Sequence, residues 1–263
     1  MLAQLLGITL SLPGLFVVQV LGGLALYYGL SWLSFKYFFV WRKEHYFPGE
    51  PMPDPAEDVQ ARKLAFWNVL GNAVLGTPFQ YWIFNGRGKL YFHVSDYGWG
   101  YFFASIVIFL VVTEFLVYWA HRILHQRWLY KHLHLHHHLY RKPTPWVSMA
   151  FHPLDSWLQA LPTYLVALFI PLHIGIYAVA FVFLMVWTFF IHDRVSFVRL
   201  PFVHYTAHHT LHHIYNKDNY GQYFTVFDRL FGTHREPMDE KKHAVMYPPT
   251  EEVPAIPALK KAA

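Results

Sequence analysis

The chain of 263 residues has no cysteine, and only 14% of its residues are charged. Without cysteine there are no disulfides, thiolate-bound zinc, iron–sulfur clusters or thiol nucleophiles. Soluble domains carry about 25% charged residues, so an ordinary water-soluble globule is disfavoured. Disorder is excluded too, because 55% of the residues are hydrophobic and 20% aromatic. The 21 basic residues form no compact run, so nothing indicates nucleic-acid binding.

The low content of charged residues reflects several long uncharged stretches. Residues 1–35 contain no charged side chain, and a membrane-spanning helix needs about 20 apolar residues. Residues 64–86 are also uncharged, and residues 97–120 carry one charge, Glu114. The longest uncharged stretch lies between Asp155 and Asp193 and suits a hairpin of two helices at 157–191. The sequence therefore predicts an all-α integral membrane protein with about four to five spanning or re-entrant helices.

The distribution of basic residues predicts the orientation. Fourteen of the 21 Lys and Arg residues follow His121. The positive-inside rule then places the histidine-rich region and the C-terminus on the cytosolic side and the N-terminus across the membrane. Near the end of the chain, Lys260 and Lys261 look like a cytosolic dilysine retrieval signal of the endoplasmic reticulum, which has meaning only in a eukaryotic protein.

The 19 histidines are strongly clustered. Seven fall between His121 and His138, and six between His192 and His213. Residues three and four apart share a helix face, so these windows can bring imidazoles together around transition-metal ions. A catalytic zinc site uses three protein ligands, and here eight or more imidazoles are available. The count predicts two metal ions in a histidine-rich cap on the cytosolic side.

Periodicity leaves two ligand sets open in the first window. If one helix runs unbroken, His132 and His136 lie on the face of His121 and His125. If the helix breaks near residues 126–129, the ligands are instead the HxxHH histidines, which are His134, His137 and His138. The second window presents His209, His212 and His213 on one helical face.

Three carboxylates are candidates for orienting the imidazoles. Glu114 lies within a predicted span, where a charge is costly and usually functional. It precedes His121 by two helical turns, so we expect it to accept a hydrogen bond from a ligand imidazole. Asp193 and Asp228 are weaker candidates for the same role. A metal transporter would carry charges deep in several spans, and Glu114 is the only charged residue within the predicted ones.

The order of the histidine motifs resembles the fatty acid hydroxylase and sterol desaturase superfamily. The order is HRILH at His121, HLHHH at His134, HPLD at His152, HD at His192 and AHHTLHHIYNKDNYGQYFTVFDRLFGT from Ala207. The stretches KPTPWVSMAFHPLDSWLQALP and NYGQYFT are most similar to the C-5 sterol desaturases of that superfamily. The resemblance extends from about residue 114 to residue 233.

The resemblance implies a non-haem di-iron enzyme that uses O2, and it favours the broken helix. It implies nine iron ligands, which are His121, His125, His134, His137, His138, His192, His209, His212 and His213. His152 and His208 also match positions of the superfamily, and we expect them to have supporting roles. Residues 1–120 would form the N-terminal transmembrane helices, 121–236 the di-iron catalytic region including the hairpin, and 237–263 a flexible cytosolic tail.

The same resemblance implies C-5 desaturation of a lathosterol-type sterol, with hydroxylation of a sterol, fatty acid or other lipid as the alternative. Electrons would come from NAD(P)H through a separate donor, because no GxGxxG dinucleotide fingerprint is present. That donor would be cytochrome b5 with its reductase, or a ferredoxin. The enzyme would lie in the endoplasmic reticulum membrane of a eukaryote or the cytoplasmic membrane of a bacterium, in contact with membrane lipid.

Overall fold

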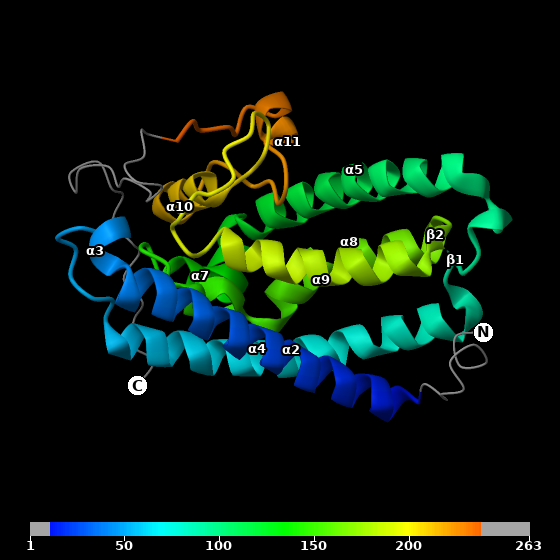
Figure 1. Cartoon of the computed structure of the whole chain (residues 1–263), viewed down its shortest axis with the longest axis horizontal. Coiled ribbons are helices and arrows are strands. Elements are labelled where there is room, and N and C mark those ends of the chain that lie inside the picture. The colour runs from blue at the N-terminus through cyan, green and yellow to red at the C-terminus, as the bar shows by residue number, and fades with distance from the viewer. Residues whose placement is uncertain (1–10, 238–263) are drawn as a thin grey trace.

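Three long helices run along the long axis of the molecule (Figure 1). The computed structural model describes residues 11–237, and in them the helices are α2 (Leu12–Ser34), α4 (Pro55–Trp82) and α5 (Gly98–Leu124). The hydroxyl of Ser11 caps α2 by accepting a hydrogen bond from the backbone N of Gly14. Asp54 caps α4 in the same way, and a proline in the first turn of each helix suits its fixed φ.

Within residues 11–237, two helices are long and apolar enough to cross a membrane. They are α5 and the combined helix Leu12–Trp41, in which α2 continues into the π-helical segment Phe35–Trp41. The predicted span at residues 64–86 lies in α4, whose first turns carry charges and which does not meet the same test among the described residues. The mostly helical fold is therefore confirmed, whereas the number of spans and the cytosolic cap stay predictions.

The predicted hairpin consists of two helices of 17 residues each, α8 (Pro153–Phe169) and α9 (Ile174–Phe190). Each is about 25 Å long, which is less than the hydrocarbon thickness of about 30 Å. Between them lies β2 (Leu172–His173), which pairs in parallel with β1 (Leu90–Tyr91). This pairing fixes the turn of the hairpin to the connection between α4 and α5.

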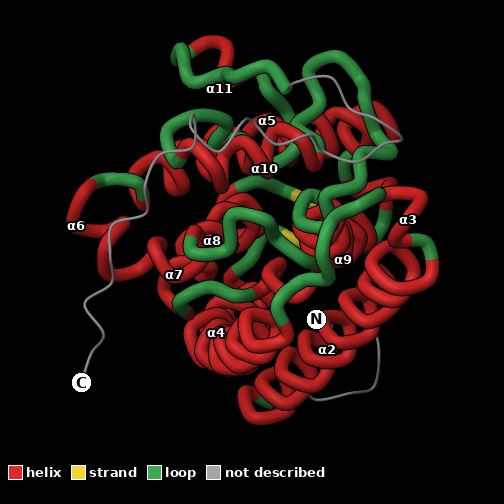
Figure 2. The backbone as a smooth tube through the Cα atoms, turned by 90° about the vertical axis from the view of Figure 1, so that its left-hand side faces the viewer, coloured by secondary structure: helices red, strands yellow, loops and turns green. Residues whose placement is uncertain are grey.

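The histidine-bearing elements gather at the opposite end from β1 and β2 (Figure 1). Viewed from that end, α4 is seen nearly end-on, and the histidine-bearing elements lie above it (Figure 2). The shorter helices are α3 (Lys43–Tyr46), α6 (Arg127–Leu129), α7 (Leu135–His138), α10 (Thr206–Tyr215) and α11 (Val226–Leu230), with a 3-10 helix at Pro145–Met149.

Buried hydrogen bonds hold the 3-10 helix against the long helices. The hydroxyl groups of Tyr27 and Ser31 in α2 donate to the carbonyl oxygens of Trp146 and Pro145, at 2.8 and 3.0 Å. The side chain of Asn68 in α4 donates to the carbonyl oxygen of Met149 at 3.0 Å. The chain that follows α7 is thereby fixed to two long helices. The expected tail, with Lys260 and Lys261, lies outside the described residues, and the division at residue 120 stays a prediction.

Candidate metal centre

The helix that carries the first histidine motif breaks within that motif. α5 ends at Leu124, and Gln126 has extended backbone angles of φ −64° and ψ 138°. The chain then reverses through α6 and a π-helical segment, Tyr130–His134, into α7. Of the two alternatives left open by periodicity, the broken helix is confirmed. The reversal brings His134 back beside His121, with their Nε2 atoms 3.2 Å apart.

The nine expected histidines converge in two groups. Within each group the ring nitrogens that offer a ligand atom lie within 4.8 Å of one another. Group A contains His121, His125, His134, His138 and His212, and group B contains His137, His192, His209 and His213. Among the described residues, His132 and His136 belong to neither group, and His132 is exposed. All nine histidines that the resemblance implies as iron ligands therefore lie in the two groups, and their role as ligands stays a prediction.

Each HxxHH motif divides its histidines between the two groups. In α7 and the turn before it, His134 and His138 belong to group A and His137 to group B. In α10, His212 belongs to group A, whereas its neighbour His213 belongs to group B. The groups therefore touch, and the ring centroids of His138 and His213 are 4.8 Å apart.

The imidazoles present bare nitrogen atoms to one another. His121 donates from Nδ1 to the carbonyl oxygen of Tyr220 at 3.0 Å, and His134 donates from Nδ1 to the Asp155 carboxylate at 2.7 Å. In a neutral ring the proton then sits on Nδ1, so the facing Nε2 atoms carry lone pairs. His212 is fixed in the same way by the carbonyl oxygen of Asp218, at 2.7 Å. Facing lone pairs repel each other, and a cation between them turns the repulsion into coordination.

Burial keeps these rings neutral. Desolvation lowers the pKa of His209, His212 and His213 well below the usual value, and it lowers the pKa of His192 to about 4. Neutral imidazole is the form that binds a metal.

The spacing of the nitrogen atoms fits metal coordination. Six Nε2–Nε2 distances around the two groups lie between 2.9 and 3.3 Å. Two ligands at right angles, each about 2.1 Å from one cation, are about 3.0 Å apart. Five and four nitrogen ligands without thiolate suit iron, copper or nickel by ligand softness. The donor set therefore fits two first-row transition-metal ions.

Asp155 is the orienting carboxylate that the sequence interpretation missed. It is 0% exposed, and its Oδ2 accepts from Nδ1 of His134 while its Oδ1 accepts from Gln159 at 2.8 Å. A carboxylate behind a ligand imidazole fixes the tautomer and raises the basicity of the ring. The available signal was the HPLD motif, in which Asp155 falls on the first turn of α8.

The expected role of Glu114 as a direct partner of an imidazole is wrong. Its carboxylate accepts three hydrogen bonds from the backbone N atoms of Gln222, Tyr223 and Phe224, at 3.0, 2.9 and 3.1 Å. These backbone N–H groups occupy both carboxylate oxygens, and within residues 11–237 no imidazole forms a hydrogen bond to Glu114. Glu114 nevertheless acts on the same loop as His121, whose Nδ1 donates to Tyr220.

The other expected supporting residues also hold backbone rather than imidazole rings. Asp228 accepts from the backbone N atoms of Tyr220 and Gly221, at 2.8 and 2.9 Å, so it fixes the carbonyl that orients His121. Asp193 accepts from the backbone N of Val195, and burial raises its pKa.

The two expected supporting histidines lie outside both groups. His152 caps α8 by accepting from the backbone N of Leu154. His208 is buried in α10 and accepts from the backbone N of Tyr205. His152 therefore stabilises the start of α8, which carries Asp155, and His208 stabilises the start of α10, which carries three histidines of the two groups.

A largely apolar cavity of about 520 Å³ connects the histidine groups to the long helices. Its wall includes His121 from group A and His137, His192 and His209 from group B. The remainder comes mainly from α2, α4, α8 and α9. Val18 of α2 lines the cavity and is 68% exposed, so the cavity reaches the outer face of the helices. The volume lies in the usual range of about 300–1,000 Å³ for small-molecule sites.

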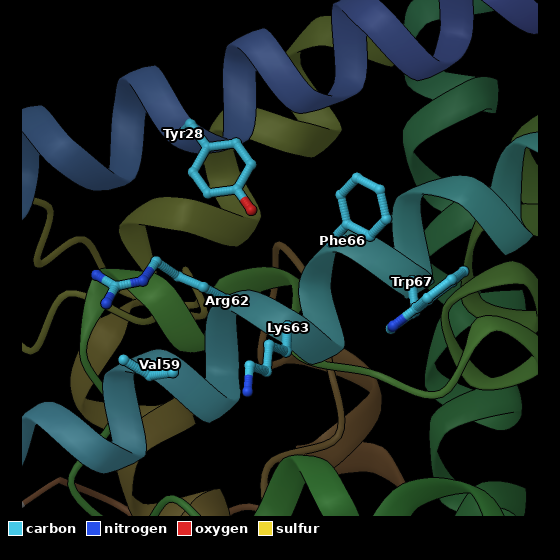
Figure 3. Close-up of a pocket in the computed structure, with 6 residues that line it drawn as sticks. All are labelled: Tyr28, Val59, Arg62, Lys63, Phe66 and Trp67. Carbon is cyan, nitrogen blue, oxygen red and sulfur yellow. The ribbon is translucent and has the colours of Figure 1, made fainter.

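A second hollow, of about 360 Å³, lies between α2 and α4 (Figure 3). Tyr28, Arg62, Lys63, Phe66 and Trp67 line it, together with one valine. Figure 3 shows Arg62 and Lys63 pointing in different directions rather than toward a common point. No histidine or carboxylate contributes to its wall, so it takes no part in the metal centre.

The sequence matches a known family. Residues 106–233 match the fatty acid hydroxylase family model. A Delta(7)-sterol 5(6)-desaturase of Schizosaccharomyces pombe is 38% identical over 223 residues, which cover 85% of this chain and 73% of the relative. A second one, from Aspergillus fumigatus, is 35% identical over 244 residues, covering 84% of this chain and 75% of the relative.

Lathosterol oxidase of Rattus norvegicus is 45% identical over 157 residues, or 58% of this chain. The chain spans about half of the length of that relative, with 52% covered. No solved structure gives a significant match.

Proposed function

Since this chain belongs to the fatty acid hydroxylase family, we propose that it is an O2-dependent membrane enzyme that introduces the C-5 double bond of a sterol. One observation carries the proposal: two touching groups of histidine side chains contribute four imidazoles to the wall of one apolar cavity that reaches the outer face of the helices. The printed names of the relatives, lathosterol oxidase and Delta(7)-sterol 5(6)-desaturase, supply the substrate class and the reaction.

Groups A and B would each hold one iron ion. When bound, the irons would supply the redox chemistry of O2. The two hydrogens lost by the substrate, two electrons and two protons from the donor, and O2 together give the desaturated sterol and two water molecules. The nine imidazoles would hold the ions through their ring nitrogens. Asp155 keeps His134 in the tautomer that binds through Nε2.

The cavity orients the substrate and excludes water. Its apolar wall favours a sterol over water by the hydrophobic effect. His121, His137, His192 and His209 line it directly, so a bound ring lies against both groups. Because Val18 is exposed on α2, a sterol would enter sideways from the bilayer without crossing the aqueous phase.

The topology and the partners belong to the same proposal. The histidine end and the C-terminus would face the cytosol, in the endoplasmic reticulum of a eukaryote or the cytoplasmic membrane of a bacterium. A separate donor would deliver the electrons, either cytochrome b5 with its NAD(P)H-dependent reductase or a ferredoxin. A basic cytosolic side suits an acidic donor.

Complementation tests the reaction. The full chain is expressed in cells that lack C-5 sterol desaturase, and the sterols are analysed by mass spectrometry. The wild-type chain should restore the 5,7-diene, and His212→Ala, as a matched control, should not. A product that gains one oxygen instead of losing two hydrogens would replace desaturation by hydroxylation. Unchanged sterols, with the protein and a donor present, would contradict the proposal.

A further inference from the structure

The chemistry of a sterol places its polar end close to the metal centre. This inference rests on the function proposed above. In a 3-hydroxysterol the carbon that bears the hydroxyl is two bonds from C-5, so the hydroxyl enters the reaction end of the cavity together with the bond that is desaturated. A buried hydroxyl needs a hydrogen-bond partner. That partner must therefore lie beside the imidazoles and not at the far end of the cavity.

Gln222 is a polar side chain at this place. It lines the cavity together with His121 and His192. Its amide Nε2 donates to the Thr188 hydroxyl at 3.1 Å. Thr188 lies one helical turn before His192, and its carbonyl oxygen accepts from Nδ1 of that ring at 2.6 Å. Two residues before Gln222, the carbonyl oxygen of Tyr220 orients His121. Gln222 thus stands between a ligand of group A and a ligand of group B.

The hydrogen bonds of Gln222 leave one acceptor free. The Thr188 hydroxyl donates to the carbonyl oxygen of Leu184 at 2.8 Å, so it can only accept from Gln222. This fixes the amide with Nε2 toward Thr188 and Oε1 away from it. Within residues 11–237, no donor forms a hydrogen bond to Oε1 of Gln222. Because Gln222 lines the cavity, a carbonyl oxygen that has no donor in the protein is a suitable partner for a hydroxyl donor of the substrate.

The backbone of Gln222 is held from two sides. Its N donates to Glu114 Oε1 at 3.0 Å, and its carbonyl oxygen accepts from the Trp187 indole at 2.7 Å. Glu114 is 1% exposed within a candidate span, where a carboxylate is costly. Its three backbone hydrogen bonds offset that cost and hold residues 222–224 in one position. A group that selects among substrates has to be positioned rigidly, and Glu114 supplies this rigidity.

We propose that Oε1 of Gln222 accepts a hydrogen bond from the 3-hydroxyl of the sterol and so selects 3-hydroxysterols and aligns C-5 and C-6 with the histidine groups. Glu114 is then a positioning residue that acts through the backbone of Gln222.

Two of the other amides in the cavity serve as matched controls. Asn72 in α4 donates to the Ser156 hydroxyl at 2.6 Å, and Gln19 in α2 donates to the Thr77 hydroxyl at 2.9 Å. Both stand on regular helices. Neither lies between a ligand of group A and a ligand of group B in the way that Gln222 does.

A competition assay tests the assignment. Membranes that contain the full chain and its electron donors receive an equimolar mixture of a Δ7-sterol and its 3-deoxy analogue, and mass spectrometry measures the ratio of the two dehydrogenated products. This ratio reports relative kcat/KM. The wild-type chain should prefer the hydroxysterol by about tenfold, the typical effect of one hydrogen bond. Gln222→Leu should bring the ratio close to one while the 3-deoxy analogue is still converted.

The controls separate the possible failures. Asn72→Leu and Gln19→Leu should keep the wild-type ratio. If Gln222→Leu also keeps it, or if one of the controls loses it instead, the assignment to Gln222 is overturned. Gln222→Met, which is closer in length, replaces the leucine variant if that variant loses iron. A wild-type chain that converts neither sterol contradicts the proposed function itself, whereas wild-type conversion with an unchanged Gln222→Leu ratio contradicts only this inference.

Discussion

Replacing Asp155 by asparagine should remove one iron from the protein. The two carboxylate oxygens accept from His134 and Gln159 at 2.7 and 2.8 Å, and both Asp155 and His134 are completely buried. An asparagine has one oxygen for these two N–H donors, so its own NH2 group faces the other donor. Changes of this kind behind a metal ligand lower metal affinity by about 10–100-fold, or about 1.4–2.7 kcal/mol.

The measurement is iron per chain after dialysis of the purified protein against increasing concentrations of chelator. Wild-type protein should retain about two irons per chain, and Asp155→Asn should fall to about one at a lower chelator concentration, because Asp155 supports group A alone. Asp193→Asn is the matched control, since that carboxylate is 2% exposed and accepts from the backbone N of Val195. Equal chelator midpoints for the two variants would refute the reasoning.

Three further outcomes are expected. In the sterol assay, His134→Ala should abolish turnover, whereas replacement of the exposed His132 by alanine should preserve it. The reverse pattern would contradict the assignment of His134 to group A. Because burial lowers the pKa of His212 well below 6.5, the unfolded chain takes up protons first as the pH falls, so the melting temperature should decrease between about pH 7.5 and 5.5. Gly221→Ala should lower the free energy of unfolding by about 1–3 kcal/mol, because a Cβ there would overlap a loop carbonyl and approach two carboxylates. Gly29→Ala should not lower the free energy of unfolding, because a Cβ there meets open space. Equal melting temperatures for the two variants would refute the packing argument.

The ligand histidines could be predicted because their spacing is local. Three- and four-residue intervals place side chains on one face of a single helical turn, whatever the helix packs against. His209, His212 and His213 therefore converge as soon as α10 forms. The first motif needed the resemblance as well, because periodicity did not show that α5 ends at Leu124.

The partners of the ligands could not be predicted because they come from distant segments. Asp155 lies in the first turn of α8 and forms a hydrogen bond to His134, which lies in a separate, earlier segment. No helical period relates the two residues. For Glu114 the two-turn spacing to His121 was informative, since both side chains contact the loop of residues 220–224. An imidazole was expected to donate to Glu114, but the backbone N–H groups of that loop donate to it instead. A pattern of residue types does not show where backbone N–H groups lie.

The division of each HxxHH motif between the two groups has a consequence for how the centre assembles. α7 and α10 each contribute to both groups, so a cation in group A joins His134 and His138 to His212 and fixes the two helices relative to each other. That single event also brings His137 beside His209 and His213. We therefore expect that one bound ion already holds α7 and α10 together, so that a one-iron form keeps the arrangement of the centre. The spacing of the two groups is set by the adjacent positions of His212 and His213 in one helix rather than by a loop.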